Sequence, residues 1–176
     1  GVVTIRQPVG TGYEPERTVY LTASLAHVQQ DSRRVRLEHD VVIHTSDGLW
    51  LSSPEMYWLP DRDELVSEQS VRIETDQMLL RGRGATGQAQ LKQAVLLRDI
   101  ELVFTQSEDS VAVQTGHPRE GSRPKSYVTI TCDGPLTFDH ERGVATFEQN
   151  VHIVDAQGDL YSDRLIAYVN TTTRRM

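Results

Sequence analysis

The chain has 176 residues, of which 38% are hydrophobic and 24% charged, a composition typical of a globular domain rather than of a disordered segment. Lysine and arginine number 18 against 25 aspartates and glutamates, and the formal net charge of −7 disfavours nucleic-acid binding, which normally requires a basic surface. The single cysteine, Cys132, can form neither an internal disulfide nor a cysteine-based zinc site, and no apolar run reaches the roughly 18 to 20 residues that a membrane-spanning helix needs.

β-Branched residues are abundant, since valine, isoleucine and threonine together account for 42 of the 176 residues. Their side chains are stiff at χ1 and suit a pleated strand better than a helix. Many of them stand in short strand-like runs, such as 41–43, 71–73, 128–130 and 151–153. The sequence therefore predicts an all-β protein, and its length fits a single domain over 1–176.

The first segment, 1–17, contains Pro8, Gly10, Gly12 and Pro15. Proline cannot donate a hydrogen bond to a sheet, and glycine weakens a strand interior. We expect this segment to be irregular or to form an edge of the sheet.

From residue 19 onward the sequence repeats with a period near thirty residues. A shift of 110 positions without a gap moves 35–59 onto 145–169 and pairs residues of like type, such as Val41 with Val151, Met56 with Ile166, and Trp58 with Tyr168. Shifts of 30 and then 29 positions carry Val41 and Ile43 onto Val71 and Ile73, and then onto Ile100 and Leu102. Such self-similarity is typical of repeated supersecondary units that stack to bury a common apolar face.

Each unit is predicted to be a strand, a turn and a second strand, as in 56–59, 60–63 and 65–73. A further turn follows at 45–48 in one copy and at 155–158 in another, where Asp, Gly and Ser favour turn dihedral angles. Units of this kind, stacked side by side, form a sandwich or a curved roll.

The segment 82–87 reads Gly-Arg-Gly-Ala-Thr-Gly and matches G-x-G-x-x-G, with a possible strand at 78–80 and a possible short helix at 88–97. A dinucleotide site would need alternating strands and helices around it, and none is predicted. The repeat also assigns this stretch to strands, with Ala85 and Gly87 in the places of Ala26 and Val28. We favour the strand interpretation and expect no cofactor.

The segment 105–127 holds Gly116, Pro118, Gly121 and Pro124, and only 111–113 resembles a strand. We expect an irregular insertion within the single domain.

No set of residues predicts catalysis or metal binding. The six histidines show neither H-x-x-x-H nor H-E-x-x-H spacing, and we expect His44 and His152 to point outward from alternating strands. There is no G-x-S-x-G nucleophile motif, and acidic residues such as Asp61, Asp63 and Asp139 stand where turns are expected. We therefore predict that the protein is not an enzyme.

Aromatic residues allow two interpretations. Trp50, Tyr57, Trp58, Tyr161 and Tyr168 could form a platform on which sugars stack. However, Trp58 and Tyr168 stand at equivalent apolar positions of the repeat, and aromatic side chains at such positions usually pack into a core. We favour the core for these two residues.

With its repeat, the chain resembles the periplasmic bridge proteins of lipopolysaccharide transport, the LptC/LptA or OstA-like family. The resemblance rests on 35–43, 147–153 and 160–168, and it extends over about 19–169. These stretches are similar to that family's strand of leucine, acidic residue, valine and apolar residue, followed by an apolar, Asp-containing strand. The first residue is Gly rather than Met, which is what an LptC-type chain without its inner-membrane helix would show, so LptC is favoured over LptA.

The resemblance implies an antiparallel two-sheet β-jelly roll, open at its ends like a folded taco, with an apolar trough between the sheets. It implies a periplasmic protein anchored to the inner membrane by a helix outside this chain. The implied partners are lipopolysaccharide, whose acyl chains the trough would shield, an LptA-like bridge protein, and an inner-membrane LptF/LptG-like transporter.

The residues expected to line the trough share one repeat register: Met56, Trp58, Val71, Ile73, Leu102, Phe138, Ile153 and Ile166. The edges expected to pair with partners are an N-terminal strand over 19–28, towards the transporter, and a C-terminal strand over 160–169, towards the next bridge protein. Their marker residues are Val19, Leu21, Leu25, Leu160, Leu165 and Val169.

Two other functions remain possible from the residues alone. One is a carbohydrate-binding or structural β-sandwich of the cell envelope without a lipid role. The other is an enzyme acting on envelope glycans, which would need two carboxylates that converge in a cleft.

Overall fold

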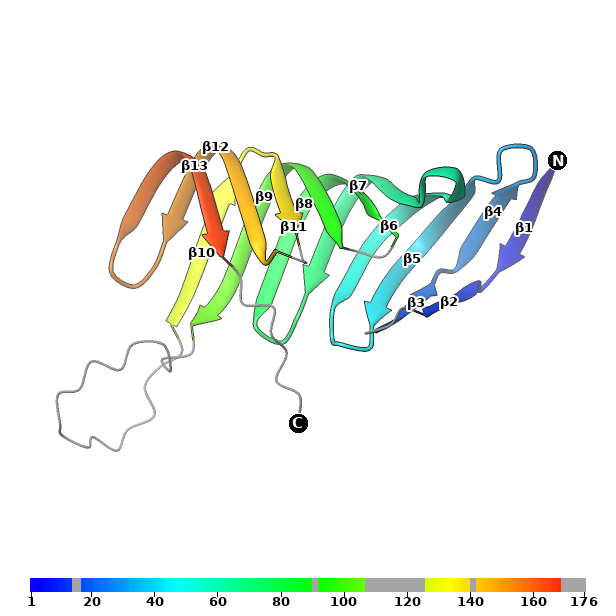
Figure 1. Cartoon of the computed structure of the whole chain (residues 1–176), viewed down its shortest axis with the longest axis horizontal. Coiled ribbons are helices and arrows are strands. Elements are labelled where there is room, and N and C mark those ends of the chain that lie inside the picture. The colour runs from blue at the N-terminus through cyan, green and yellow to red at the C-terminus, as the bar shows by residue number, and fades with distance from the viewer. Residues whose placement is uncertain (14–16, 90–91, 107–125, 140–141, 169–176) are drawn as a thin grey trace, which may run out of the picture.

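A computed structural model describes residues 1–13, 17–89, 92–106, 126–139 and 142–168 (Figure 1). Within these ranges the chain forms thirteen strands and one short 3₁₀ helix, η1 (Pro60–Arg62), and has no α-helix. Every strand pairing is antiparallel, which confirms the predicted all-β fold. The strands are β1 (Val2–Arg6), β2 (Val9–Tyr13), β3 (Thr18–Thr22), β4 (Leu25–Gln29), β5 (Val35–Thr45), β6 (Trp50–Leu59), β7 (Glu64–Glu74), β8 (Met78–Gln88), β9 (Gln93–Gln106), β10 (Ser126–Cys132), β11 (Leu136–Asp139), β12 (Val144–Val154) and β13 (Asp159–Tyr168).

The topology is a meander in which three long strands are interrupted. β5 pairs with β4 through its first half and with β3 through its second half, so β3 and β4 form one broken strand. β1 and β2 pair with β4 and β3 in the same way. β10 and β11 both pair with β9 on one side and with β12 on the other. We call each long strand, or each pair of short strands that together make one broken strand, a ribbon. Each ribbon of the sheet lies beside its neighbour in sequence.

A line of bends crosses this single sheet, and we call it the fold line. On β5 and β12 it is marked by adjacent residues in the left-handed region, His39 with Asp40 and Gln149 with Asn150, and by a register shift at each place. Bulges of this kind bend a strand. Backbone hydrogen bonds continue along the line, for example from Gln7 N to Ser24 O (2.9 Å) and from Ser24 N to His39 O (2.9 Å).

The fold line divides the sheet into two arms that face each other across the core. Arm 1 contains β1, β4, β11 and the halves of the long strands that pair with them, and arm 2 contains β2, β3, β10 and the remaining halves. Figure 1 shows the ribbons arching over between the arms. The two layers of the predicted roll are thus halves of one hydrogen-bonded sheet.

The repeat is visible in the core. Val41, Val71 and Ile100 stand at matching positions of β5, β7 and β9, and their exposed fractions are 0%, 2% and 2%. The predicted turn at 60–63 contains η1 and ends at Asp63 in the left-handed region. Within the predicted N-terminal segment 1–17, the described residues 1–13 contain the edge strands β1 and β2, in agreement with the expectation of an edge. Of the insertion expected at 105–127, residues 105–106 belong to β9 and 126–127 to β10, and 107–125, including 111–113, lie outside the described residues.

The G-x-G-x-x-G segment lies within β8, and the described part of 88–97 includes the start of β9 rather than a helix. A Cβ atom on Gly82 would stand 2.6 Å from Cδ2 of Leu96, and Gly84 has a φ of +71°. The glycines therefore allow β8 to bend closely against β9, and they serve the fold rather than a nucleotide.

Candidate functional site

The inner faces of both arms carry rows of apolar side chains, and the arm 1 row is interrupted on β7 by Ser67, which lies opposite Ala85. Directly opposed pairs link the arm 2 row across eight ribbons: Leu21, Ile43, Leu51, Ile73, Leu80, Leu102, Ile130 and Ile153. The arm 1 row includes Ala26, Leu37, Met56, Ala85, Leu96, Leu136, Phe147 and Leu165. We call the space between the two rows the trough.

The polar side-chain contacts observed among the described residues do not join the arms across the trough. Between described residues, each observed side-chain hydrogen bond or ion pair lies within one arm or along the fold line. Arg36 and Glu55 pair within arm 1 at 2.8 Å, and Arg81 and Glu101 pair within arm 2 at 3.7 Å. At the fold line, Ser53 Oγ and Ser67 Oγ lie 3.0 Å apart, and each also donates to the carbonyl oxygen of Glu55. Apolar contact alone thus closes the trough between these residues.

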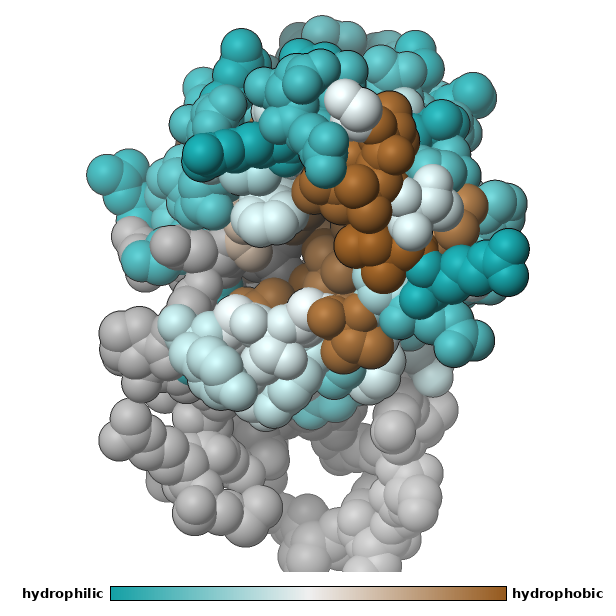
Figure 2. Space-filling view, turned by 90° about the vertical axis from the view of Figure 1, so that its right-hand side faces the viewer, coloured by the Kyte–Doolittle hydropathy of each residue, from teal (hydrophilic) through white to brown (hydrophobic). Residues whose placement is uncertain are grey.

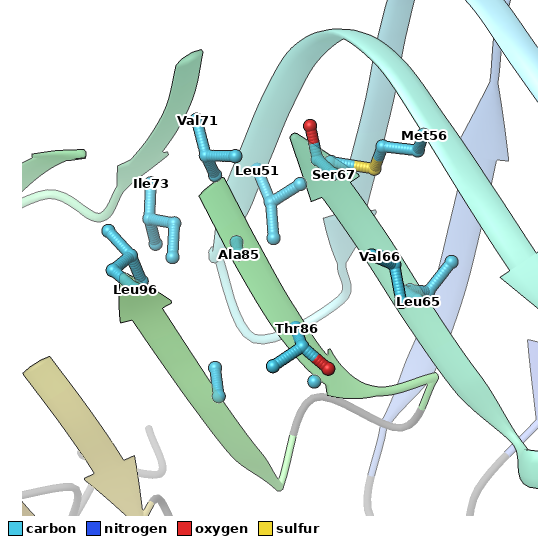
Figure 3. A pocket seen from close by; sticks show the side chains of 12 residues that line it. Leu51, Met56, Leu65, Val66, Ser67, Val71, Ile73, Ala85, Thr86 and Leu96 are labelled. Carbon is cyan, nitrogen blue, oxygen red and sulfur yellow. The ribbon is translucent and has the colours of Figure 1, made fainter. Parts of the chain in front are cut away.

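The trough is narrow. A cavity of about 30 Å³ lies between the arms, and its lining includes Leu51 and Ile73 from arm 2 and Met56, Ala85 and Leu96 from arm 1 (Figure 3). A volume of this size holds no more than about two water-sized spheres. An acyl chain could therefore enter only if the arms moved apart.

The trough reaches the surface at the end that carries β1. Val3 and Ile5, both 43% exposed, continue the inner face of arm 1 beyond Val28 and Ala26, and Trp58 lies on the same face with 38% exposure. Figure 2 looks onto this end and shows apolar side chains gathered around a hollow. We call this opening, lined by Val3, Ile5 and Trp58, the mouth of the trough.

Most of the predicted trough residues lie on the inner faces. Met56, Val71, Ile73 and Leu102 are buried there, and Phe138 and Ile153 are partly buried against them. Trp58 is at the mouth rather than in the closed core that we favoured for it.

Ile166 and Tyr168 are corrections to the sequence interpretation. Ile166 lies opposite Thr146, and Tyr168 opposite Val144, on the outer face of β13, where they are 47% and 83% exposed. The hairpin before β13 closes one residue sooner than the hairpin before β6, because Asp155 N donates to Gly158 O whereas Thr45 N donates to Leu49 O. Leu165 rather than Ile166 therefore takes the place of Met56. A shift of one residue moves every side chain of a strand to the opposite face.

The predicted N-terminal edge is also corrected. Val19 and Leu21 lie in β3 between β2 and β5, and Leu25 lies in β4 between β1 and β5. The edge of the sheet is formed by β1 and β2. At the other end, Leu160 and Leu165 lie in β13, which pairs only with β12 among the described strands, and Val169 lies outside the described residues.

Aromatic rings on the outer face of arm 2 stack on one another. His44 is sandwiched between Tyr20 and Trp50, with ring centroids 4.8 and 4.5 Å apart, and His152 stacks on Tyr161 at 4.2 Å. The expected outward direction of His44 and His152 is confirmed. Because the rings cover one another's faces, less of each face is available to stack on a sugar.

A charged cluster lies on the outer face of arm 1. Arg36 donates to Glu38 (Nε–Oε1, 2.9 Å) and to Glu55 (Nη2–Oε2, 2.8 Å). The hydrogen bond from Arg36 lowers the pKa of Glu55, and a hydrogen bond from Tyr57 lowers it further. The same bond with Glu55 raises the pKa of Tyr57. These interactions join β5 to β6 and do not converge in a cleft.

Groups suited to metal or thiol chemistry are not assembled in the described part of the chain. No group of three or more His, Cys, Asp or Glu residues there could hold a metal ion. Cys132 is buried on the inner face near the fold line, and desolvation raises the pKa of its thiol. The described ranges also contain no helix of the length and apolarity needed to span a membrane.

Sequence reasoning missed the arm 1 row formed by Leu96, Leu136, Phe147 and Leu165 as a lining of the trough. The shift of 110 residues also places Phe147 at the position of Leu37, and this was a usable signal because Leu37 lies directly opposite Met56 on the same face. No sequence signal distinguished the inner face of β13 from its outer face.

Comparison with known protein families gives a match. A family model described as lipopolysaccharide-assembly, LptC-related, matches residues 1–105, which is more than half of the 176 residues. No curated protein matches the chain.

Proposed function

The chain belongs to the LptC-related family of lipopolysaccharide-assembly proteins, and from this premise we propose that it is a periplasmic bridge component that shields lipid acyl chains in its trough. Involvement in lipopolysaccharide transport follows from the family, which is a transport family rather than a known family of enzymes. The finer proposal concerns how the trough and the edges of the sheet serve that transport.

The observation that carries the proposal is the pair of facing apolar rows. Each methylene group that leaves water contributes roughly 0.8 kcal/mol, so an acyl chain between the rows is favoured over one in the aqueous periplasm. The polar side chains on the outer faces keep the protein hydrated while the sugar headgroup stays in water.

Opening of the arms is the step that this binding requires. The cavity of about 30 Å³ is too small for an acyl chain, but the arms are held together across the trough by apolar contact. An entering chain replaces those contacts with similar ones, so the cost of separating the arms is largely recovered. The fold line, with its backbone hydrogen bonds, stays intact and acts as the hinge.

Edge strands supply the proposed docking sites. β13 has an unpaired side among the described strands, and an extended strand of an LptA-like protein can continue the sheet there by main-chain hydrogen bonds. The N-terminal edge at β1 and β2 is proposed to face an LptF/LptG-like transporter, with a membrane anchor outside this chain.

Photo-crosslinking tests whether lipid enters the trough, by comparing adjacent residues whose side chains lie on the inner and the outer face of the same strand. A photo-reactive residue is introduced at Leu165 or Phe138, and the matched controls carry it at Ile166 or Thr137 on the outer face. Lipopolysaccharide adducts are expected from the two inner positions and not from the outer ones. Equal adducts from both faces, or none from the inner positions of folded protein, would contradict the proposal.

A further inference from the structure

β1 is held to the sheet more weakly than the long strands. It pairs only with β4 among the described strands, over the five residue pairs from Val2–Gln29 to Arg6–Leu25. All five of its side chains are exposed, whereas the longer β5 and β7 alternate buried and exposed residues. Segments with few buried contacts are those that open most readily.

One polar side-chain contact between described residues ties β1 to its neighbour β4. Thr4 Oγ1 lies 3.1 Å from Nδ1 of His27 in β4, and Nε2 of the same ring lies 3.4 Å from Oε2 of Glu38 in β5. His27 thus connects the edge strand to the charged cluster on the outer face of arm 1. No other β1 side chain has a hydrogen bond or ion pair with a described residue.

Removal of β1 would expose a strand that is ready to pair. The free main-chain groups of β4 would form the new edge, beside Ala26 and Val28, whose side chains face the trough. The chemistry of a replacement strand can be read from β1 itself. It needs apolar residues at the positions of Val3 and Ile5, and a hydroxyl at the position of Thr4 to meet His27.

We infer that β4 is a docking strand covered by β1, and that an extended segment of a partner protein displaces β1 and pairs antiparallel with β4. The partner chemistry is a strand of alternating apolar and hydroxyl-bearing residues. The existence of a partner protein rests on the proposed function. The release of β1 does not, because it can be measured in the isolated protein.

The test uses the full chain, a dye-labelled synthetic peptide with the sequence of residues 2–7, and a reversible lock on β1. In the lock variant Val2→Cys/Gln29→Cys, the two substituted residues are directly opposed and exposed, and opposed residues of antiparallel strands have the Cα separation that a disulfide accepts. A control lock, Thr146→Cys/Ile166→Cys, joins β12 to β13 at the other end of the sheet.

Saturable peptide binding is expected for the wild-type chain and for the control lock. The oxidised β1 lock should bind at least about tenfold less, and reduction of the disulfide should restore binding. Amide exchange in β1 should be at least about tenfold faster than in β6. His27→Gln should accelerate exchange in β1 and leave β6 unchanged.

Peptide binding that the β1 lock does not alter would overturn the inference, as would absence of binding to the unlocked protein. Exchange in β1 as slow as in β6 would overturn it as well. These results leave the trough proposal unaffected, because lipid crosslinking from Leu165 and Phe138 is measured separately.

Discussion

Leu165 of β13 lies directly opposite Phe147 of β12, whose side chain is completely buried. The next residue, Ile166, lies opposite Thr146 and faces solvent. We expect Leu165→Ala to lower the free energy of unfolding by about 1–2 kcal/mol, less than a fully buried leucine would, because Leu165 is only partly buried. Ile166→Ala should change it by less than about 0.5 kcal/mol.

Urea denaturation of both variants measures the difference. A larger effect at Ile166 than at Leu165 would mean that the register of β13 is shifted by one residue from the one described here.

The inner faces of β5, β7 and β9 could be predicted from the repeat, because shifts of 30 and then 29 residues match the buried residues Val41, Val71 and Ile100. Prediction was wrong at β13, where a gapless shift could not account for the shorter turn. The bends could have been recognised in part, since His39–Asp40 and Gln149–Asn150 stand at equivalent positions and Asn, Asp and His tolerate the left-handed region better than most residues.

The edges of the sheet could not be predicted in the same way. The glycines and prolines of 1–17 argued against regular strands there, and so β1 and β2 were not predicted. Pro8 is tolerated because it follows Gln7 in the gap between β1 and β2, where the fold line crosses the chain. The repeat also does not indicate which strand is outermost, because it identifies the residues of the inner faces and not the pairing partners of each strand.

Gly82 should not tolerate a side chain. The new methyl group of Gly82→Ala would stand 2.6 Å from Cδ2 of Leu96, which is buried, and we expect a loss of about 1–3 kcal/mol in the free energy of unfolding. Gly10→Ala is the control, because its nearest neighbour would be 3.6 Å away. In a double-mutant cycle, Gly82→Ala should cost less when Leu96 is already alanine, and additive effects would show that the contact is not the cause.

The Glu55 carboxylate should make stability depend on pH in the acid range. Hydrogen bonds from Arg36 and Tyr57 lower its pKa in the folded protein below the ordinary value of 4.5. Its contribution is therefore present above pH 4.5 and is lost as the pH falls through the lower folded value. Chemical denaturation midpoints of the wild type and Glu55→Gln should differ slightly at pH 7 and converge once the pH falls below the lowered folded pKa of Glu55. A difference that grows on acidification would contradict the assigned sign.

Cys132 should react slowly with thiol reagents in the native protein. Its side chain is 5% exposed, and desolvation raises its pKa, so both access and thiolate formation are suppressed. Maleimide labelling at pH 7 should be much slower than for the unfolded chain in urea. Equal rates in the two states would show that the interior near the fold line is open to solvent without lipid.

Filling the cavity should raise the stability of the closed trough and at the same time reduce its uptake of lipid. Ala85 lines the cavity of about 30 Å³ and lies opposite Leu96, so the two added methyl groups of Ala85→Val can occupy space that is already empty. Cavity-filling changes commonly add about 0.5–2 kcal/mol to the free energy of unfolding. The same methyl groups would obstruct an acyl chain between β6 and β9, and we expect fewer lipopolysaccharide adducts from a photo-reactive residue at Met56. Thr137→Val on the outer face is the control and should leave the adducts unchanged. If Ala85→Val stabilises the protein without reducing crosslinking, lipid does not pass through this part of the trough, and the mouth at Trp58 becomes the place to examine for its binding.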